Sequence, residues 1–415
     1  MPDLGIKSKE MTSHPAVRFL DRSTPPHIAT LILLAGLSAL SLNIFLPSLP
    51  GMTEYFDTDY RLMQLSVAVY LAMNAVLQLF IGPISDRYGR RPVILWSCGL
   101  FLLATLGCII ATTAEMFLVF RMAQAVIVTG MVLSRAVVRD MFPQEQAASM
   151  IGYVTMGMSI VPMVGPAFGG VLDQWFGWKA NFWALFALGV ALLWLIWRDL
   201  GETVAKENQS FAAQFREYPE LFTSRRFWGY CIAAASTSGA FFAYLGGAPF
   251  VGTEVFGMDP ATLGFFFGAP AVGYLVGNGI SGRYSVRIGI NSMILWGSIL
   301  SAGGLLMSLV LNYAGLKTPL SFFGFMVFVG LGNGLVLPNA NAGMLSVRPH
   351  LAGTAAGVGG AIMIGGGAAL SAFAGAMLTP GSGAAPLIVI MLMSGLIGVL
   401  AISYVIRRER EITVS

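Results

Sequence analysis

The sequence predicts an all-α integral membrane protein with twelve transmembrane helices, and its composition, its apolar runs and its basic residues indicate this class. Only 11% of the 415 residues are charged, against about 25% in an ordinary soluble protein. Hydrophobic residues make up 56%, and the mean hydropathy is +0.74. The 50 glycines suit this class, because small residues let membrane helices approach one another closely.

Twelve apolar runs have about the 20 residues that a helix needs to cross a bilayer. They are residues 28–49, 62–82, 92–112, 116–138, 147–172, 178–198, 227–251, 261–282, 289–312, 318–341, 350–377 and 384–406. An even number of spans places both termini on the same side of the membrane.

The basic residues indicate which side this is. Twenty of the 24 lysines and arginines belong to the N-terminal tail, the loops after even-numbered spans and the C-terminal tail. Arg61, Lys179 and Lys317 lie on the opposite side, and Arg121 lies inside a span. Since basic loops favour the cytoplasm, we expect both termini to be cytoplasmic.

A polar segment after the sixth span divides the chain into halves of similar size. A short loop after span 8, residues 281–289, echoes residues 82–91 after span 2, with arginines and a glycine but no acid. We therefore expect two pseudo-symmetric six-helix bundles. The predicted domains are an N-terminal tail (1–27), the first bundle (28–198), a linker (199–226), the second bundle (227–406) and a C-terminal tail (407–415).

The loop between spans 2 and 3 carries the densest set of motif residues. It reads Gly82-Pro-Ile-Ser-Asp-Arg-Tyr-Gly-Arg-Arg91. Its glycines and Pro83 predict a tight reversal. Asp86 is placed to accept from basic groups or to cap a helix N-terminus, where the helix dipole favours an anion.

This loop resembles the signature loop of the major facilitator superfamily, and other segments narrow the resemblance to the drug–proton antiporters of twelve spans. Phe120–Ala125 is similar to the fourth-span arginine motif, and Met163–Gly170 to the fifth-span motif of antiporters. Leu42–Pro50 and Ser134–Asp140 resemble the bicyclomycin and chloramphenicol resistance (Bcr/CflA-like) branch. The resemblance implies the major facilitator fold and transport across a bacterial inner (plasma) membrane.

The resemblance also implies a conformational latch on the cytoplasmic side, which breaks when the carrier turns inward. Its candidate residues are Gly82, Asp86, Arg87, Gly89, Arg90, Arg91, Arg139 and Asp140. A simpler interpretation is that the arginines only fix the topology. Topology alone, however, requires neither an acid nor spaced glycines.

The fifth span carries the candidate antiporter motif. Its small residues leave one face nearly bare and its prolines bend the helix. This pattern favours a contact between the two halves. Ordinary packing of small residues within one bundle would give the same sequence pattern. The motif residues are Gly157, Gly165, Pro166, Gly169 and Gly170.

Arg121 is the most unusual residue inside a span. An arginine there costs about 2.5–3.5 kcal/mol on insertion scales and usually faces the bundle interior. The family motif, with Gln124 nearby, favours a role in a cavity; the alternative is that the side chain snorkels to the outer interface. This chain departs from its family in span 1, where the usual acid is replaced by Asn43.

The predicted span interiors contain no Asp, Glu or His. Proton coupling needs a group that titrates, and neither asparagine nor arginine does. Three possibilities stay open: a peripheral carboxylate such as Asp173 or Asp86 couples, the substrate brings its own proton or charge, or transport is uncoupled. Arg121 beside Asn43, without an acid, would suit an anionic substrate.

The candidate substrate-binding residues are polar or aromatic side chains within spans. Tyr70, Asn74 and Gln78 recur at i, i+4 and i+8 and form one stripe, which must face protein or water. Inter-helix hydrogen bonds, or contact with lipid for the aromatic residues, would account for them equally. The full set is Asn43, Tyr70, Asn74, Gln78, Arg121, Gln124, Tyr153, Met156, Phe241, Phe242 and Tyr244.

The sequence indicates a transporter and not an enzyme. It lacks a nucleotide-binding loop, a metal cluster and a catalytic triad, so we expect no cofactor and no metal. We expect a secondary active transporter that exports small amphipathic or drug-like molecules. The family resemblance implies that this export is coupled to protons. Alternatives are an exchanger, importer or facilitator of an organic anion, or a transporter-like receptor. The expected partners are the substrate, protons and the lipid bilayer, without nucleic acid, and the chain is expected to be a monomer.

Overall fold

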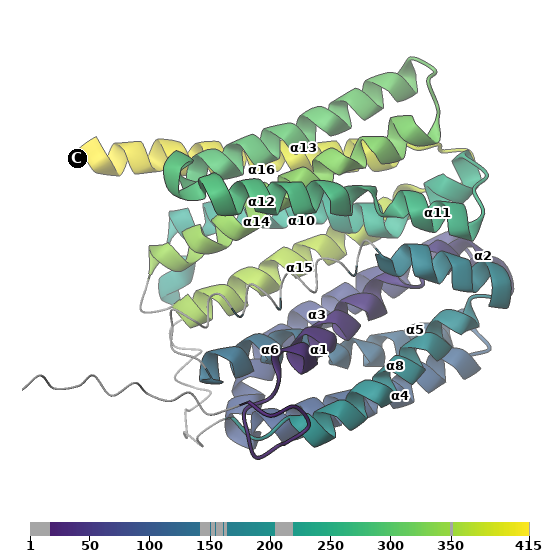
Figure 1. Cartoon of the computed structure of the whole chain (residues 1–415). Coiled ribbons are helices and arrows are strands. Elements are labelled where there is room, and N and C mark those ends of the chain that lie inside the picture. Colours follow the sequence, from purple (N-terminus) through teal and green to yellow (C-terminus); the bar gives the residue numbers. More distant parts are fainter. Residues whose placement is uncertain are drawn as a thin grey trace, which may run out of the picture.

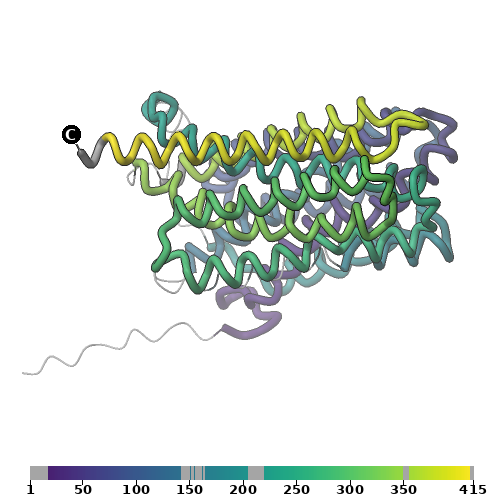
Figure 2. The backbone as a smooth tube through the Cα atoms, turned by 90° about the horizontal axis from the view of Figure 1, so that it is seen from above, coloured from purple at the N-terminus to yellow at the C-terminus, as the bar shows by residue number. Residues whose placement is uncertain are grey.

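The computed structural model describes residues 17–141, 150, 154, 161, 164–203, 219–348 and 352–414. Within these ranges the chain forms helices and turns without a strand. Figure 1 shows two groups of helices, one above the other: the N-half (residues 17–203) and the C-half (residues 219–414). In Figure 2, turned by 90°, the long helices of both groups run along one common direction.

The N-half contains the first group of spans. Short 3-10 turns interrupt two of its helices without ending the crossing, so Ile28–Tyr55 and Ala114–Met141 each form one continuous span. Residues 164–176 are helical as well. The elements are α1 (Ile28–Asn43), η1 (Leu46–Ser48), α2 (Leu49–Tyr55), α3 (Tyr60–Tyr88), α4 (Arg90–Ile110), α5 (Ala114–Gln124), η2 (Ala125–Ile127), α6 (Val128–Met141) and α8 (Lys179–Asp199).

The C-half repeats this arrangement. Its elements are α10 (Arg225–Phe250), η3 (Val251–Val255), α11 (Pro260–Phe267), α12 (Ala269–Ile288), α13 (Ile290–Tyr313), η4 (Leu320–Gly324), α14 (Met326–Val347), α15 (Ala352–Met377) and α16 (Ala385–Val414). Among the described residues, eleven helices are long and apolar enough to cross a membrane. The predicted fifth span, 147–172, falls partly outside the described residues. The predicted all-α class is confirmed.

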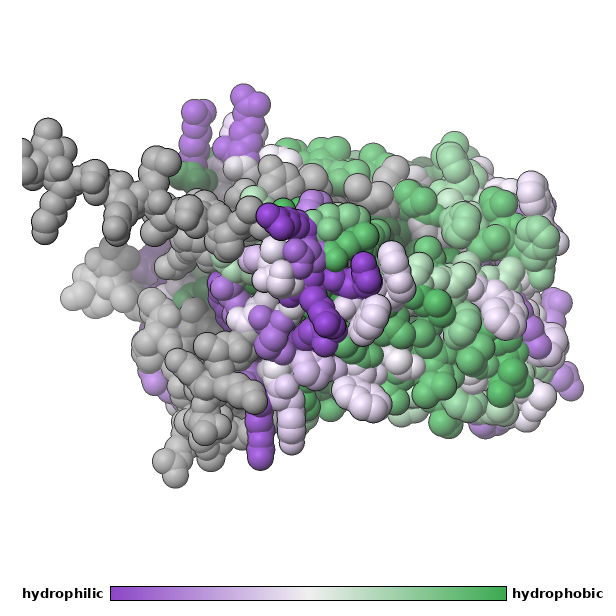
Figure 3. Space-filling model, turned by 60° about the horizontal axis from the view of Figure 1, so that its bottom comes forward, coloured by the Kyte–Doolittle hydropathy of each residue, from purple (hydrophilic) through white to green (hydrophobic). Residues whose placement is uncertain are grey.

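The helices join at two ends of the molecule. We call the end where α3 meets α4 the latch end; α16 also ends there, at the left of Figure 1. The opposite end, near α2 and α11, is the far end. Figure 3 shows a broad hydrophobic surface with hydrophilic residues gathered mostly towards the latch end. Such a surface suits contact with lipid.

The turn between α3 and α4 is much shorter than the sequence predicts. The expected reversal covers residues 82–91, but Gly82 and Pro83 lie inside α3, and Gly89 alone separates the two helices. Its φ of +98° is one that few residues other than glycine adopt. The end of an apolar run marks the membrane boundary, whereas the helix continues until a residue stops it.

Candidate functional site

The latch residues form a network inside the N-half. Arg90 is 4% exposed; it forms ion pairs with Asp86 (2.6 Å) and Asp140 (3.1 Å) and donates to the Ser85 hydroxyl. One buried guanidinium therefore holds α3, α4 and α6 together. The bonds join elements of one half only, so the network does not itself clamp the N-half to the C-half.

The start of α4 is capped by an acid that is not among the residues predicted from the sequence. Glu202 accepts from the backbone N–H groups of Arg90 (2.8 Å) and Arg91 (3.3 Å). Arg91 donates to the Leu200 carbonyl oxygen, which ties α4 to the end of α8. The sequence assigns Glu202 to the polar linker. Its position just after the sixth span, close to a basic loop, could have indicated this contact.

The remaining latch candidates make fewer contacts. Arg87 lies over the ring of Tyr88, at 5.5 Å from its guanidinium carbon to the ring centroid. Arg139 is exposed. A Cβ on Gly82 would meet no atom within 4 Å, so close packing does not require glycine there. The network therefore centres on Arg90.

Arg121 is buried in the N-half. Its side chain is 1% exposed and donates to the Gln124 side-chain oxygen (2.5 Å) and the Ser41 carbonyl oxygen (2.7 Å). Its guanidinium carbon lies 4.1 Å from the ring centroid of Tyr70 and 4.4 Å from that of Phe45. Aromatic faces attract cations most strongly where water is excluded. The snorkelling interpretation is therefore wrong.

The charge of Arg121 has no counter-ion among the residues that the structure describes. Neutral acceptors and two aromatic faces hold it instead, and its Nε has no hydrogen-bond partner within the described ranges. Gln124 is fixed in turn by a bond to the Thr105 hydroxyl, at 2.8 Å. A buried cation in this state favours any anion that reaches it.

No hydrogen bond joins Asn43 to Arg121, although Arg121 binds Ser41, two residues before Asn43 on the same helix. Asn43 instead faces Gly165, whose Cβ would lie 3.7 Å from the Asn43 Cβ. The Asn43 amide donates to the Ala39 carbonyl oxygen, and its own side-chain oxygen is buried without a partner among the described residues.

The stripe on α3 faces protein along its length. Tyr70 covers Arg121, and the Gln78 amide donates to the Asn74 side-chain oxygen at 2.6 Å. A Cβ on Gly360 of α15 would lie 3.2 Å from the Gln78 side-chain oxygen, so Gln78 reaches the other half. The stripe therefore runs from the interior of the N-half to the contact between the halves.

The aromatic candidates on α10 divide into two groups. Tyr244 is fully buried in the C-half, where its ring lies 4.8 Å from that of Phe267 and its hydroxyl donates to the Phe267 carbonyl oxygen. In this conformation Tyr244 is therefore part of the packed interior of the C-half. Phe241 and Phe242 are half-buried, and Phe242 packs over Gly367 of α15. Tyr153 and Met156 lie outside the described residues.

The fifth-span motif packs on both halves. A Cβ on Gly169 would collide with the Ile44 carbonyl oxygen, and one on Gly170 with the Pro260 carbonyl oxygen of the C-half. A Cβ on Gly264 would likewise strike the Pro166 carbonyl oxygen. Backbone thus meets backbone between the halves at the far end. Gly165 packs on Leu40 of α1, and Gly157 lies outside the described residues.

Hydrogen bonds also join the halves at the far end. The Tyr60 hydroxyl donates to the Gly246 carbonyl oxygen at 2.8 Å. The Gln64 amide donates to the Ser371 carbonyl oxygen (2.5 Å) and hydroxyl (2.9 Å). Both donors lie near the start of α3, and both acceptors belong to helices of the C-half. These bonds were not predicted, because single polar residues near span ends are common.

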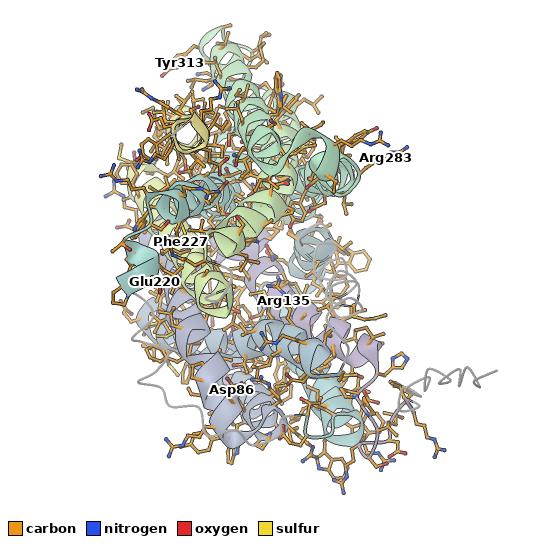
Figure 4. The ribbon with its side chains drawn as sticks, turned by 90° about the vertical axis from the view of Figure 1, so that its left-hand side faces the viewer. Asp86, Arg135, Glu220, Phe227, Arg283 and Tyr313 are labelled. Carbon is orange, nitrogen blue, oxygen red and sulfur yellow. The ribbon has the colours of Figure 1, made fainter. Side chains whose placement is uncertain are left out.

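The latch end is open between the halves at Arg135. Figure 4, which looks onto the latch end, places Arg135 between the N-half below and the C-half above. The side chain is exposed, forms no ion pair with a described residue, and interacts electrostatically with Tyr274 of α12. The count of basic residues in the sequence puts Arg135 with the cytoplasmic loops, whereas it lies within α6. Because residue 135 precedes the predicted end of span 4, the sequence could have placed Arg135 inside the span.

Asp173 is the half-buried acid of the far end. It follows the glycine motif on the same helix. Burial raises the pKa of this carboxyl above its ordinary value, while a hydrogen bond from Ser48 acts against the shift. The Ser48 hydroxyl also accepts from the buried amide of Asn181 at 2.9 Å. Asp173 therefore keeps its proton to a higher pH than an exposed aspartate would.

Comparison with known proteins gives consistent relatives. The family model described as Major Facilitator Superfamily matches residues 31–372. The "Chloramphenicol resistance protein" of Pseudomonas aeruginosa is 31% identical over 337 residues, which are 80% of each chain. "Multidrug resistance protein D" of Escherichia coli (strain K12) is 29% identical and covers 89% of this chain and 93% of its own.

A solved structure supports the fold. A bacterial homolog of the human lysosomal transporter Spinster, in an inward-facing and occupied conformation, aligns with a TM-score of 0.70. The alignment covers 92% of this chain and 96% of that chain at 18% identity. The helices of this chain are thus arranged as in a known transporter.

Proposed function

Because the chain belongs to the Major Facilitator Superfamily and is a secondary transporter, we propose that it exports small amphipathic or drug-like molecules across a bacterial inner membrane by alternating access. The two halves would be the moving bodies, corresponding to the bundles 28–198 and 227–406. The relatives named for chloramphenicol and multidrug resistance support this substrate class.

The observation that carries the proposal is the difference between the two ends of the molecule. The far end is closed by the Gly170–Pro260 contact and the Gln64–Ser371 bonds, while Arg135 at the latch end is exposed between the halves. The distribution of basic residues favours a cytoplasmic latch end. The described conformation would then accept substrate from the cytoplasm.

Drug tolerance of a pump-deficient bacterium tests this function. Expression of the chain should raise tolerance to at least one amphipathic drug, with chloramphenicol and bicyclomycin in the panel. Gly170→Leu should abolish the gain, because its side chain cannot fit against Pro260. Gly51→Ala is the matched control, since its Cβ would meet no atom within 4 Å. Unchanged tolerance across drug classes, at normal membrane levels of the protein, would refute export.

For the energy source, we propose coupling to protons through Asp173. The carboxyl is half-buried, its pKa is raised by burial, and it lies close to the Gly170 contact that must break when the far end opens. When the far end opens, the hydrated carboxyl would exchange protons with the outside, and its burial on closure would favour the protonated form, so that the proton is carried inward. Because the pKa of Asp173 is raised in the closed conformation, its proton stabilises that conformation. This stabilisation is complete at pH values below the pKa of an exposed aspartate, and it is lost as the pH rises through the raised pKa.

Transport into proteoliposomes with an imposed pH gradient tests this coupling. Asp173→Asn should remove the response to the gradient but retain counterflow of substrate. Glu115→Gln, an exposed acid at the same end, should leave both intact. Asn43→Asp introduces an acid where the family usually has one in the first span. A gain of proton coupling in that variant would show that residue 43 occupies the coupling position of the family.

A second candidate function is exchange of an organic anion. Two observations favour it: Arg121 is buried without a carboxylate among the described residues, and Arg135 is exposed between the halves. Accumulation of a permanently charged cation, driven by a pH gradient alone, would rule this function out. Counterflow of an organic anion that is lost in Arg135→Gln would favour it over drug export.

A further inference from the structure

A groove runs along the outer surface of the C-half, outside the space between the halves. It has a volume of about 1100 Å³ and lies between α15 and α16, with Ala235 and Ser236 of α10 at its floor. Small residues keep the floor low: Gly366 of α15 lines it too, and its Cβ would lie 3.5 Å from the Ala235 Cβ. All of its lining residues belong to the C-half.

The walls and the mouth of the groove differ in chemistry. Exposed apolar side chains of Ile232, Phe373, Met393 and Ile397 line the walls. The mouth lies at the far end and carries Lys317, with Ser382 and Tyr313 beside it. An apolar channel with a basic, hydrogen-bonding mouth matches an amphiphile that has an anionic head and an apolar tail.

The length of the groove matches one leaflet of a bilayer. Between Pro386 and Ile397 α16 advances about 17 Å, at roughly 1.5 Å per residue. Half of the hydrocarbon core is about 15 Å thick. The groove thus reaches from the far-end surface to about the middle of the membrane, as a single acyl chain does.

The charge at the mouth is isolated. Lys317 is exposed and forms no ion pair with any residue in the described part of the chain. The other basic residues described in the C-half, from Arg225 to Arg410, belong to the latch end or to the last turns of α16. Glu254, next to the lining residue Val255, does not itself line the groove.

We propose that this groove binds one anionic phospholipid of the far-end leaflet, with its phosphate at Lys317 and one acyl chain between α15 and α16. Near a membrane surface one lysine contributes about fivefold to the affinity for an anionic headgroup. The proposal depends on the membrane location of the chain and not on which compound it exports.

Native mass spectrometry of the purified full chain tests the proposal, with phosphatidylglycerol and phosphatidylethanolamine of identical acyl chains as probes. The wild type should retain one phosphatidylglycerol about fivefold more tightly than phosphatidylethanolamine. Lys317→Gln should remove this preference, and Lys179→Gln, a far-end base of the N-half, should keep it. Gly366→Leu, which fills the groove, should weaken retention of both lipids.

Circular dichroism and size-exclusion profiles identify any variant that fails to fold, and Gly366→Ala then replaces Gly366→Leu. Equal retention of the two lipids by the wild type, or an unchanged preference in Lys317→Gln, would overturn the proposal. So would a Gly366→Leu variant that loses drug tolerance with normal lipid retention, which would assign the groove to the exported compound. Loss of lipid preference in Lys317→Gln without any drug export in the wild type would leave this site standing and refute only the proposed function.

Discussion

The two halves use the same turn at the latch end but surround it with different chemistry. In both, a glycine with positive φ separates the second helix from the third: Gly89 at +98° and Gly289 at +88°. Each glycine N–H donates at 2.9 Å to a serine carbonyl oxygen four residues earlier, in Ser85 and Ser285. The backbone of the repeat has been kept.

The side chains around the turn have diverged. Asp86, three residues before the glycine, corresponds to Val286, which is 96% exposed, and Arg90 corresponds to Ile290. The C-half has its ion pair elsewhere: Glu409 of α16 pairs with Arg226 of α10 and accepts from the Asn291 amide at the start of α13.

One feature is common to both halves despite this divergence. In each half a glutamate near the end of the last helix binds the start of the third helix: Glu202, just after α8, binds α4, and Glu409, in the last turns of α16, binds α13. The N-half adds the partly exposed pair between Asp86 and the buried Arg90. Both halves therefore have a glutamate that joins the last helix to the third, and among the described residues the N-half alone adds an ion pair at the turn itself.

The largest expected effect is that of Arg90→Ala. It leaves Asp86 and Asp140 together without their cation, and we expect a loss of about 3 kcal/mol in stability, with transport abolished. Thermal unfolding in detergent and drug tolerance measure the two effects. Arg87→Ala is the control and should change stability by less than about 0.5 kcal/mol, because Arg87 is exposed. Equal damage from both variants would contradict the central role of Arg90.

Gly89→Ala and Gly289→Ala should rank next. Both force a β-carbon into a backbone conformation that costs about 1–3 kcal/mol. Only at Gly89 would the Cβ also strike a side chain, that of Glu202; at Gly289 it would meet nothing within 4 Å. Thermal unfolding should therefore show the larger loss for Gly89→Ala, and the reverse order would refute the packing difference.

Glu409→Gln tests the glutamate contact of the C-half. It removes the charge that pairs with Arg226 but retains a side-chain acceptor, so we expect a loss of about 1 kcal/mol in stability and a normal transport rate per folded protein. The neighbouring exposed Glu411, whose pKa is lowered by a hydrogen bond from Arg408, provides the control Glu411→Gln. Slower transport at unchanged stability would show that the C-half network also switches.

The smallest effect is expected from building the N-half chemistry into the C-half. Val286→Asp alone replaces an exposed apolar residue and should alter stability by less than about 0.5 kcal/mol. With Ile290→Arg added, a double-mutant cycle should reveal an attractive coupling between the two new side chains. A coupling of zero would mean that the shared backbone is not sufficient to form the pair.

Much of the fold could be predicted because hydropathy reports which segments contact lipid. The predicted run 178–198 and α8 (Lys179–Asp199) agree within one residue at each end. The run 62–82 stops six residues before α3 ends at Tyr88, since helices continue through polar segments until a residue such as Gly89 stops them. Hydropathy does not report that limit.

The candidate site was less predictable, for two physical reasons. Neutral acceptors such as the Ser41 carbonyl oxygen leave no trace in a sequence, so the surroundings of Arg121 could not be foreseen. Aromatic residues also suit cores and cavities equally, so the full burial of Tyr244 in the C-half could not be foreseen. The latch acid Asp86 could be found because an acid among closely spaced arginines strongly favours an ion pair.

The contacts that close the far end have a consequence for the resting population of the transporter. Side-chain hydrogen bonds between membrane helices contribute on average about 0.6 kcal/mol each and at most about 1.7. With those of Tyr60 and Gln64 together near 2 kcal/mol, they bias the equilibrium by roughly 30-fold. A ligand that prefers the opposite conformation by about that factor offsets these hydrogen bonds, while the backbone contact at Gly170 adds its own contribution to the bias.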